Sequence, residues 1–369
     1  MMIDVAKPQK ITIFAERGIK ITTSDWHPFF VMEQITFSKQ CPLCDKPLKN
    51  KNAFAAHLMH RSACRENYRK RAKYKVVEKR ADELKKGDYI LQNAQNLLPE
   101  KSQLNSELAY LLGFVIGDGS IAEVKKNRKN KNVTHYRVRF FSKAKPTLEK
   151  IVHILNHCFD CEVKPLKDGK HERFIIETTA ITDLLFQYHL ITGNKADTSA
   201  IPAEVKRHLS KENFYSFLAG LIDSDGHIDK RDGNIEYCTV SEKMADDIVE
   251  MCTIAGVLSS KHGKITRKET GVIIYRVVIS ASQTTLLKEK LPLQKGKTSI
   301  KDGLSNRLKR HLPIVRVSRT SKLEVQDNEF YDLTTKHNHN YLAGNNSFVF
   351  VHNTVLHLYM NERISGAQA

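Results

Sequence analysis

The sequence predicts a multidomain α+β protein: an all-β module in two sequence halves, a small inserted finger, and a larger pseudo-twofold module with the order αββαββα in each half. Three observations predict it. The chain has 369 residues, more than one hydrophobic core usually organises. Its middle part matches itself when residue 218 is aligned with residue 111. Segments with β character lie at both ends, and a Cys-x-x-Cys pair interrupts the first of them.

The helices of the repeat are predicted by two nonamers, LLGFVIGDG at 111–119 and LAGLIDSDG at 218–226. Each places small residues four apart, which share one face of a helix and allow close packing. These are Gly113 and Gly117 in the first copy, and Gly220 and Ser224 in the second. Packing along these faces would bring Asp118 and Asp225, near the two helix ends, together.

Each nonamer is followed by two strands, a helix, further strand segments and a helix. In the strand after the first nonamer, His135, Arg137 and Arg139 alternate with Tyr136, Val138 and Phe140. Such alternation puts the basic side chains on one face of a sheet, where they can meet phosphates and base edges. A merely solvated sheet face would show the same pattern.

The charge balance favours a polyanionic partner. The chain has 59 Lys and Arg against 41 Asp and Glu, a net charge of +18. The basic residues come in runs, which favours a docking face for double-stranded DNA over an evenly solvated surface. The side chains expected to contact DNA are Arg69, Arg71, Lys125, Lys126, Arg128, Lys129, Arg137 and Arg139.

Targeting signals are absent from the sequence. It has neither a run of about 18 apolar residues nor a charged-then-apolar leader, so we expect a cytoplasmic protein without membrane contact. Seven Cys suit a reducing compartment and a metal site better than a disulfide framework. Cys238 and Cys252 are expected to be core thiols.

At the two nonamers the chain resembles the two-motif LAGLIDADG (DOD-type) homing endonucleases, since LAGLIDSDG differs from the eponymous motif at one position. We assign residues 99–297 to this domain. The resemblance implies a monomeric saddle of two sheets that grips double-stranded DNA, with Asp118 and Asp225 as catalytic acids that bind Mg²⁺. Carboxylate-held divalent cations suit the dianionic transition state of phosphodiester cleavage. A remnant that binds DNA without cutting it remains the alternative.

The basic residues that would assist this catalysis are less clearly indicated by the sequence. Many relatives place a lysine shortly before an Ile-Pro pair, but here Ser199 and Ala200 precede Ile201. Simple phosphate contact would explain the remaining candidates equally well. These are Lys195, Lys295 and Lys297.

The stretch 330–354, FYDLTTKHNHNYLAGNNSFVFVHNT, resembles the C-terminal end of inteins, whose splicing (Hint) domain is an all-β horseshoe. Asn353 can attack its own main-chain carbonyl, form a succinimide and break the bond to Thr354. Thr354 offers a hydroxyl for the preceding transesterification. The resemblance implies proton transfer by His339 and His352, assisted by Asp332. We assign 311–353 to this half of the splicing domain.

Residues 1–37 and 72–98 resemble the other half of that domain, with His27 as the residue that activates the upstream scissile bond. Inteins begin with Cys, Ser or Thr, whereas this sequence begins Met-Met-Ile-Asp. We therefore expect splicing in cis to fail, and three explanations stay open: a start site placed too late, decay, or an N-terminal intein fragment acting in trans. Residues 354–369 resemble a stretch of anaerobic ribonucleotide reductase, as a host segment would.

Residues 38–71 carry the pattern of a small zinc finger. Cys41, Cys44 and His57 are three ligands, and the fourth is Cys64 or His60, of which we favour Cys64. The segment has few apolar residues, so Zn²⁺ would form its core. A second Cys-x-x-Cys pair, Cys158 and Cys161, lacks a partner pair, and core packing explains it better than metal binding.

Overall fold

The computed structural model describes residues 9–16, 19–34, 40–41, 44, 46–65, 74–93, 95–128, 131–168, 173–190, 199–231, 233–266, 271–294, 314–323, 340–343 and 349–352, and the observations below concern these. The chain forms two compact units, one made of residues 1–93 and 313–369 and the other of residues 94–312. No helix among the described residues is long and apolar enough to cross a membrane.

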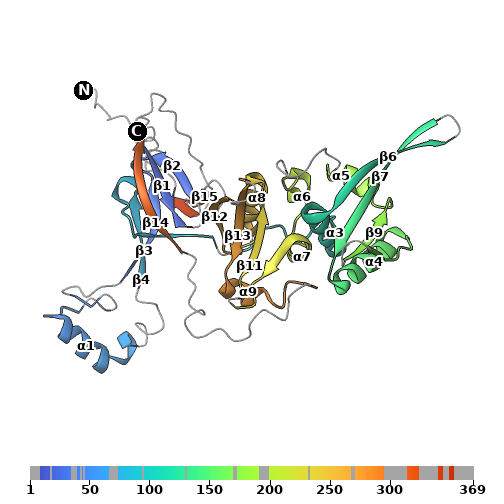
Figure 1. Ribbon diagram of the computed structural model, residues 1–369. Coiled ribbons are helices and arrows are strands. Elements are labelled where there is room, and N and C mark those ends of the chain that lie inside the picture. Colours follow the sequence, from blue (N-terminus) through green and yellow to red (C-terminus); the bar gives the residue numbers. More distant parts are fainter. Residues whose placement is uncertain are drawn as a thin grey trace, which may run out of the picture. The chain divides into compact units, whose positions relative to one another are not determined.

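The first unit is built on an eight-stranded sheet with the order β15-β16-β3-β5-β14-β1-β2, in which β4 also pairs with β3 (Figure 1). Its strands are β1 (Lys10–Ala15), β2 (Lys20–Ser24), β3 (Pro28–Gln34), β4 (Tyr74–Arg80), β5 (Tyr89–Leu91), β14 (Ile314–Leu323), β15 (Asn340–Ala343) and β16 (Val349–His352). A short 3-10 turn, η2 (Ala81–Glu83), follows β4. Alternating β-branched and aromatic residues form its core, among them Ile11, Ile13, Phe29, Val31 and Val351. The two sequence halves therefore share one sheet, as the sequence predicts.

Two long connections leave this sheet between strands that are antiparallel neighbours. β3 pairs with β4 up to Gln34 opposite Tyr74, and the finger segment lies between them. β5 pairs with β14, with Leu91 opposite Ile314, and the residues of the whole second unit come between these two strands in the sequence. Within the finger, α1 (Lys51–His60) begins at Asn50, whose side chain accepts a hydrogen bond from the Ala53 N–H at 2.8 Å.

The second unit contains the order αββαββα twice. The first copy runs α3 (Ser106–Asp118), β6 (Ser120–Arg128), β7 (Lys131–Ser142), α4 (Lys145–Phe159), β8 (Leu166–Asp168), β9 (Arg173–Thr178) and α5 (Thr182–Gln187). After α6 (Ala203–Arg207), the second copy runs α7 (Phe214–Asp225), β10 (Gly226–Ile228), β11 (Ile235–Thr239), α8 (Glu242–Ile254), β12 (Ser259–Thr266), β13 (Ile273–Ile279) and α9 (Ala281–Leu287). The sheets have equivalent orders, β6-β7-β9-β8 and β10-β11-β13-β12. β6 and β7 form a long hairpin (Figure 1).

Helices α3 and α7 pack against each other with almost no space between their backbones. A Cβ added to Gly113 would lie 2.2 Å from the Phe217 carbonyl oxygen, and one added to Gly220 would lie 2.1 Å from the Tyr110 carbonyl oxygen. Neither approach is possible for a real Cβ atom, so only glycine fits. The flanking apolar side chains are buried on all sides, which explains why both helices are apolar around their circumference.

One sequence expectation about the core is wrong. Cys252 on α8 is buried, but Cys238 on β11 is exposed. Strand β11 alternates, and Tyr237 and Ile235 take the inward positions, so Cys238 must face outward.

We expect Gly113→Ala to lower the free energy of unfolding of the second unit by about 3 kcal/mol or more, because the new methyl group must push two backbones apart. Gly271→Ala is the matched control. Its Cβ would meet nothing within 4 Å, so only the left-handed φ of 68° opposes it, at about 1 kcal/mol. Chemical denaturation followed by circular dichroism measures both. Equal losses in the two variants would contradict the close contact.

Candidate functional site

Asp118 and Asp225 are the last residues of α3 and α7, and both are exposed. The residues just before them, Gly117 and Ser224, touch across the helix pair: a Cβ on Gly117 would lie 1.9 Å from Ser224 Oγ. The two helices therefore end side by side. The structure brings the two carboxylates to one end of the helix pair, as the repeat predicts.

Tyr237 on β11 is buried close to both acids, and its pKa is affected by each of them. Its hydroxyl oxygen lies 3.6 Å from the place that a Cβ on Gly117 would take. Burial, followed by the negative charges of Asp225 and Asp118, raises the pKa of Tyr237 above its usual value. The negative charges of both carboxylates therefore act on the same buried phenol. It therefore stays protonated and uncharged at neutral pH.

Asp223 in the second nonamer is a buried carboxylate that our sequence reasoning passed over. It is 1 % exposed, and its Oδ2 accepts hydrogen bonds from the Tyr110 hydroxyl and from the Gln294 N–H, each at 2.8 Å. The first copy has Ile116 at the matching position. An acid inside an otherwise apolar helix was the available signal, since such a group needs partners. Asp223 fixes the chain just before Lys295.

The alternation expected along β7 is present. Val138 and Phe140 are buried, whereas Arg137 and Arg139 are partly exposed on the other face. Glu177 on β9 pairs with both arginines, with 2.6 Å to Arg139 Nε and 3.4 Å to Arg137 Nη1. Two cations therefore share one anion. A phosphate approaching this face must compete with Glu177 for them.

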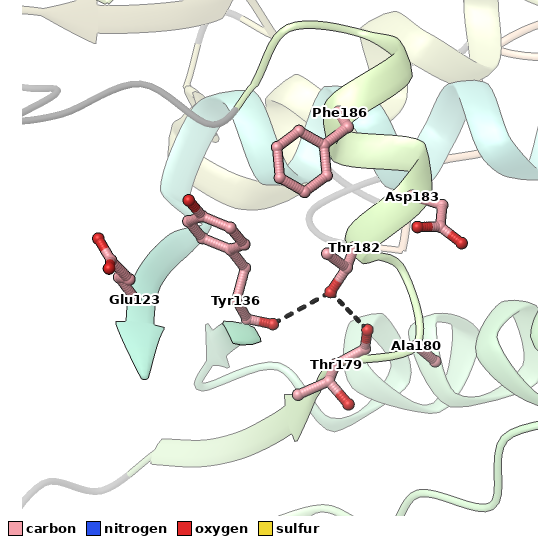
Figure 2. A pocket seen from close by; sticks show the side chains of 7 residues that line it. All are labelled: Glu123, Tyr136, Thr179, Ala180, Thr182, Asp183 and Phe186. Carbon is pink, nitrogen blue, oxygen red and sulfur yellow. Dashed lines mark hydrogen bonds between the residues drawn. The ribbon is translucent and has the colours of Figure 1, made fainter. Parts of the chain in front are cut away.

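The opposite face of the same sheet carries a cavity of about 560 Å³ (Figure 2). It is lined by Glu123, Tyr136, Thr179, Ala180, Thr182, Asp183 and Phe186. The rings of Tyr136 and Phe186 meet edge to face at 5.3 Å, and the Thr182 hydroxyl donates to the Tyr136 carbonyl oxygen at 3.2 Å. Since Tyr136 alternates with Arg137, the cavity does not belong to the arginine face.

In the finger, Cys41, Cys44, His57 and Cys64 offer ligand atoms that all lie within 4.8 Å of one another. Cys44 Sγ is 3.4 Å from His57 Nε2. This Cys₃His group could hold a metal ion. His60, the alternative fourth ligand, is exposed and is not a member of the group. Phe54 and Leu48 pack beside Cys41 and Cys64 and form the small core expected there.

In the first unit, His27 is 7 % exposed and lies directly before β3. Its carbonyl oxygen accepts a hydrogen bond from the Ala81 N–H at 2.9 Å, and its ring meets Phe29 edge to face. β16 pairs with β3, with Val351 opposite Phe29. The strand that ends at His352 therefore lies beside the strand that begins just after His27, so the two sequence halves meet there.

Several predicted site residues lie outside the described residues. These are Arg69, Arg71, Lys129, Lys195, Lys295, Lys297, Asp332, His339, Asn353 and Thr354. For another group only the backbone is described, in strands β6 and β16: Lys125, Lys126, Arg128 and His352. The roles assigned to all of them stay predictions.

Comparison with known proteins supplies a family. Residues 68–353 match the model of the intein splicing domain family. A curated relative is the replication factor C small subunit of Methanocaldococcus jannaschii, 28% identical over 206 residues, which are 55% of this chain and 10% of that protein. Another is the ATP-dependent DNA helicase Hel308 of the same organism, 24% identical over 200 residues, which are 54% of this chain and 15% of the helicase. The chain thus spans less than a fifth of the length of either protein.

Among solved structures, the chain is similar to the homing endonuclease I-DmoI in complex with DNA and manganese. The sequence identity is 15% and the TM-score 0.37, over 54% of this chain and 98% of that one. It is also similar to the homing endonuclease I-WcaI bound to its DNA recognition sequence, with 14% identity and a TM-score of 0.38, over 55% of this chain and 89% of that one.

The Cys₃His group yields a prediction about its fourth ligand. In protein saturated with Zn²⁺, Cys64→Ser should expose Cys41 and Cys44 to alkylation, because one thiolate of the ligand set is lost. The matched variant His60→Ala should leave them protected. Mass spectrometry of the finger peptide reads both cysteines directly. Protection that fails in His60→Ala and persists in Cys64→Ser would reverse the assignment.

Proposed function

This chain belongs to the intein splicing domain family, and from that premise we propose that it is an intein whose 94–312 unit is a LAGLIDADG homing endonuclease that makes metal-dependent double-strand cuts in DNA. One observation carries the proposal: two exposed carboxylates, Asp118 and Asp225, lie at the adjoining ends of two tightly packed helices. Such a pair repels itself unless a cation joins it.

Asp118 and Asp225 would hold the divalent cations, for which Mg²⁺ is the natural choice because hard oxygen ligands suit it. A cation bound there stabilises the charge that develops on the phosphate and the leaving oxygen. The protein's own contribution is placement. The helix contact would fix the spacing of the two acids, and Tyr237 would add an uncharged, buried phenol close to them. Lys295 would provide a positive charge next to the segment that Asp223 anchors.

DNA binding would use the sheet face that carries Arg137 and Arg139, together with the long β6–β7 hairpin. Its sequence includes Lys125, Lys126 and Arg128. Glu177 prevents the two arginines from binding anions indiscriminately, because a phosphate must outcompete a carboxylate that is already hydrogen-bonded to Arg139. We also propose that the finger binds Zn²⁺ and that its basic neighbours, Arg69 and Arg71, extend the DNA footprint.

Splicing chemistry is the second proposed activity, and the family membership together with the β3–β16 pairing favours it. Asn353 would cyclise and release the chain that follows, with His352 and His339 moving protons and Asp332 assisting. Thr354 would serve as the downstream nucleophile. His27, held at the start of β3, would act where an N-terminal intein fragment supplies the upstream junction in trans.

We expect Asp118→Asn and Asp225→Asn each to slow the cutting of DNA that carries the joined host sequence by about a thousandfold, since cation-held charge stabilisation contributes several kcal/mol. Agarose gels with Mg²⁺ separate nicked from linear plasmid. Asp160→Asn is the matched control: Asp160 is exposed and has a φ of 46°, which asparagine tolerates.

Binding must be measured in parallel, with Ca²⁺ in place of Mg²⁺. Variants that bind but do not cut support the assignment of the acids. If the unaltered protein binds DNA with strong salt dependence and never cuts it, the chain is the non-catalytic DNA-binding remnant instead.

Purified protein should slowly lose residues 354–369 through cyclisation of Asn353, and intact-mass spectrometry would show the smaller product. Asn353→Ala should block the release, because the attacking amide is gone. Asn345→Ala should not. An unchanged mass of the unaltered protein after long incubation, with its fold verified by circular dichroism, would rule out this activity.

A further inference from the structure

A cluster of metal-ligating side chains lies in the second unit at the end of α3 opposite to Asp118. Glu107 in the first turn of α3 meets His153, His157 and Cys158 of α4. Glu107 Oε2 is 2.7 Å from His157 Nδ1 and 3.3 Å from Cys158 Sγ, and Glu107 Oε1 is 3.6 Å from His153 Nε2. None of these residues takes part in the functions proposed above.

The sequence builds this cluster from the periodicity of α4. His153 and His157 are four residues apart, so they share one face, and their rings stack at a centroid distance of 6.0 Å and an interplanar angle of 12°. Cys158 is half-buried beside them and points toward α3. The two imidazoles are about 70 % exposed, at 71 % and 69 %, so a metal ion can reach them from solvent.

The spacing of the donor atoms fits a tetrahedral metal. Bond lengths of about 2.0–2.3 Å to nitrogen, oxygen and sulfur place the donors of a tetrahedral zinc site roughly 3.3–3.8 Å apart. The atoms of Glu107, His157 and Cys158 all lie within 4.8 Å of one another. A shift that widens the 2.7 Å separation of Glu107 Oε2 and His157 Nδ1 to this spacing would make room for the ion.

Contrary to the expectation from the sequence alone, we propose that Glu107, His157 and Cys158 form a second transition-metal site, with Zn²⁺ as its natural occupant and with His153, next to Glu107, as the fourth ligand after a movement of its side chain. Two imidazoles, a thiolate and one carboxylate select Zn²⁺ over Mg²⁺ or Ca²⁺, which prefer oxygen ligands alone. The site ties the start of α3 to the end of α4. It is separate from Asp118 at the other end of α3, since the eleven steps from residue 107 to residue 118 span roughly 16 Å of helix.

The site occurs in one repeat only. With residue 218 aligned to residue 111, the position of Glu107 corresponds to Phe214, which is buried in the core. The second repeat therefore has a buried aromatic ring where the first has the carboxylate of Glu107.

Cysteine alkylation tests the site in the unaltered full-length chain. After removal of metal by a chelator, Zn²⁺ is added back and iodoacetamide labelling is followed by peptide mass spectrometry. Zn²⁺ should suppress the labelling of Cys158 and leave that of Cys161 unchanged, because the Cys161 thiol lies against Thr178 instead. Equal labelling of Cys158 with and without Zn²⁺ would overturn the proposal.

Cobalt absorbance provides a second readout that does not depend on cleavage or splicing. In a Cys41→Ser, Cys44→Ser, Cys64→Ser background, which removes the thiolates of the finger, one Co²⁺ should bind with a thiolate-to-cobalt band. Cys158→Ser should abolish the band, and His157→Ala should weaken binding at least about tenfold. Cys161→Ser is the matched control and should retain both. A band that survives Cys158→Ser, or never forms in the background protein, refutes the site.

Discussion

The contact between the backbones of α3 and α7 is the constraint on which the second unit depends. Gly113 and Gly220 lie against carbonyl oxygens of the facing helix, so the helix separation is set by main-chain atoms rather than by adaptable side chains. Because Asp118 and Asp225 are the last residues of these helices, the same separation determines the distance between the two carboxylates. Each helix also leads directly into the first strand of its own sheet, so this contact sets where both sheets begin. A site that needs two acids at a fixed spacing is best held in this way.

Around this symmetric centre the accessory residues differ between the repeats. Asp223 is buried and hydrogen-bonded in the second repeat, where the first has Ile116. Glu107 reaches two histidines and a cysteine in the first repeat, where the second has Phe214. A single chain can diversify its two halves independently, unlike a homodimer. In the endonuclease that we propose, such differences would suit a DNA site that is not symmetric.

The sequence predicts the parts of this fold that depend on local periodicity. The nonamers, the αββαββα order and the alternation of Arg137 with Val138 follow from residue spacing. Contacts that depend on strand register cannot be predicted from residue spacing. Glu177 reaches Arg139 because β7 and β9 pair at those two residues, and nothing local in either strand indicates that pairing.

The fourth ligand of the finger is another feature that local periodicity does not fully explain. The helical spacing from His57 favoured Cys64, and Cys64 does lie in the Cys₃His group, but not by continued periodicity. α1 ends at His60, Arg61 is extended, and a separate helical turn at 62–65 brings Cys64 back toward Cys41. The prediction of Cys238 as a core thiol was wrong because it followed from the residue type alone. It ignored which face of strand β11 position 238 occupies.

The sheet of the first unit explains how one chain accommodates such different modules. Both insertions connect strands that are antiparallel neighbours, β3 with β4 and β5 with β14. Paired residues in such strands lie about 5 Å apart, so each insertion replaces a hairpin loop and leaves the hydrogen-bond ladder intact. The entropy of closing a loop grows only with the logarithm of its length, so even the long insertion opposes sheet formation only weakly. What the sheet requires of each insertion is only that its two ends lie close together. The unit of residues 94–312, whose internal contacts are its own, can therefore change without altering the pairing that brings His27 beside the strand ending at His352.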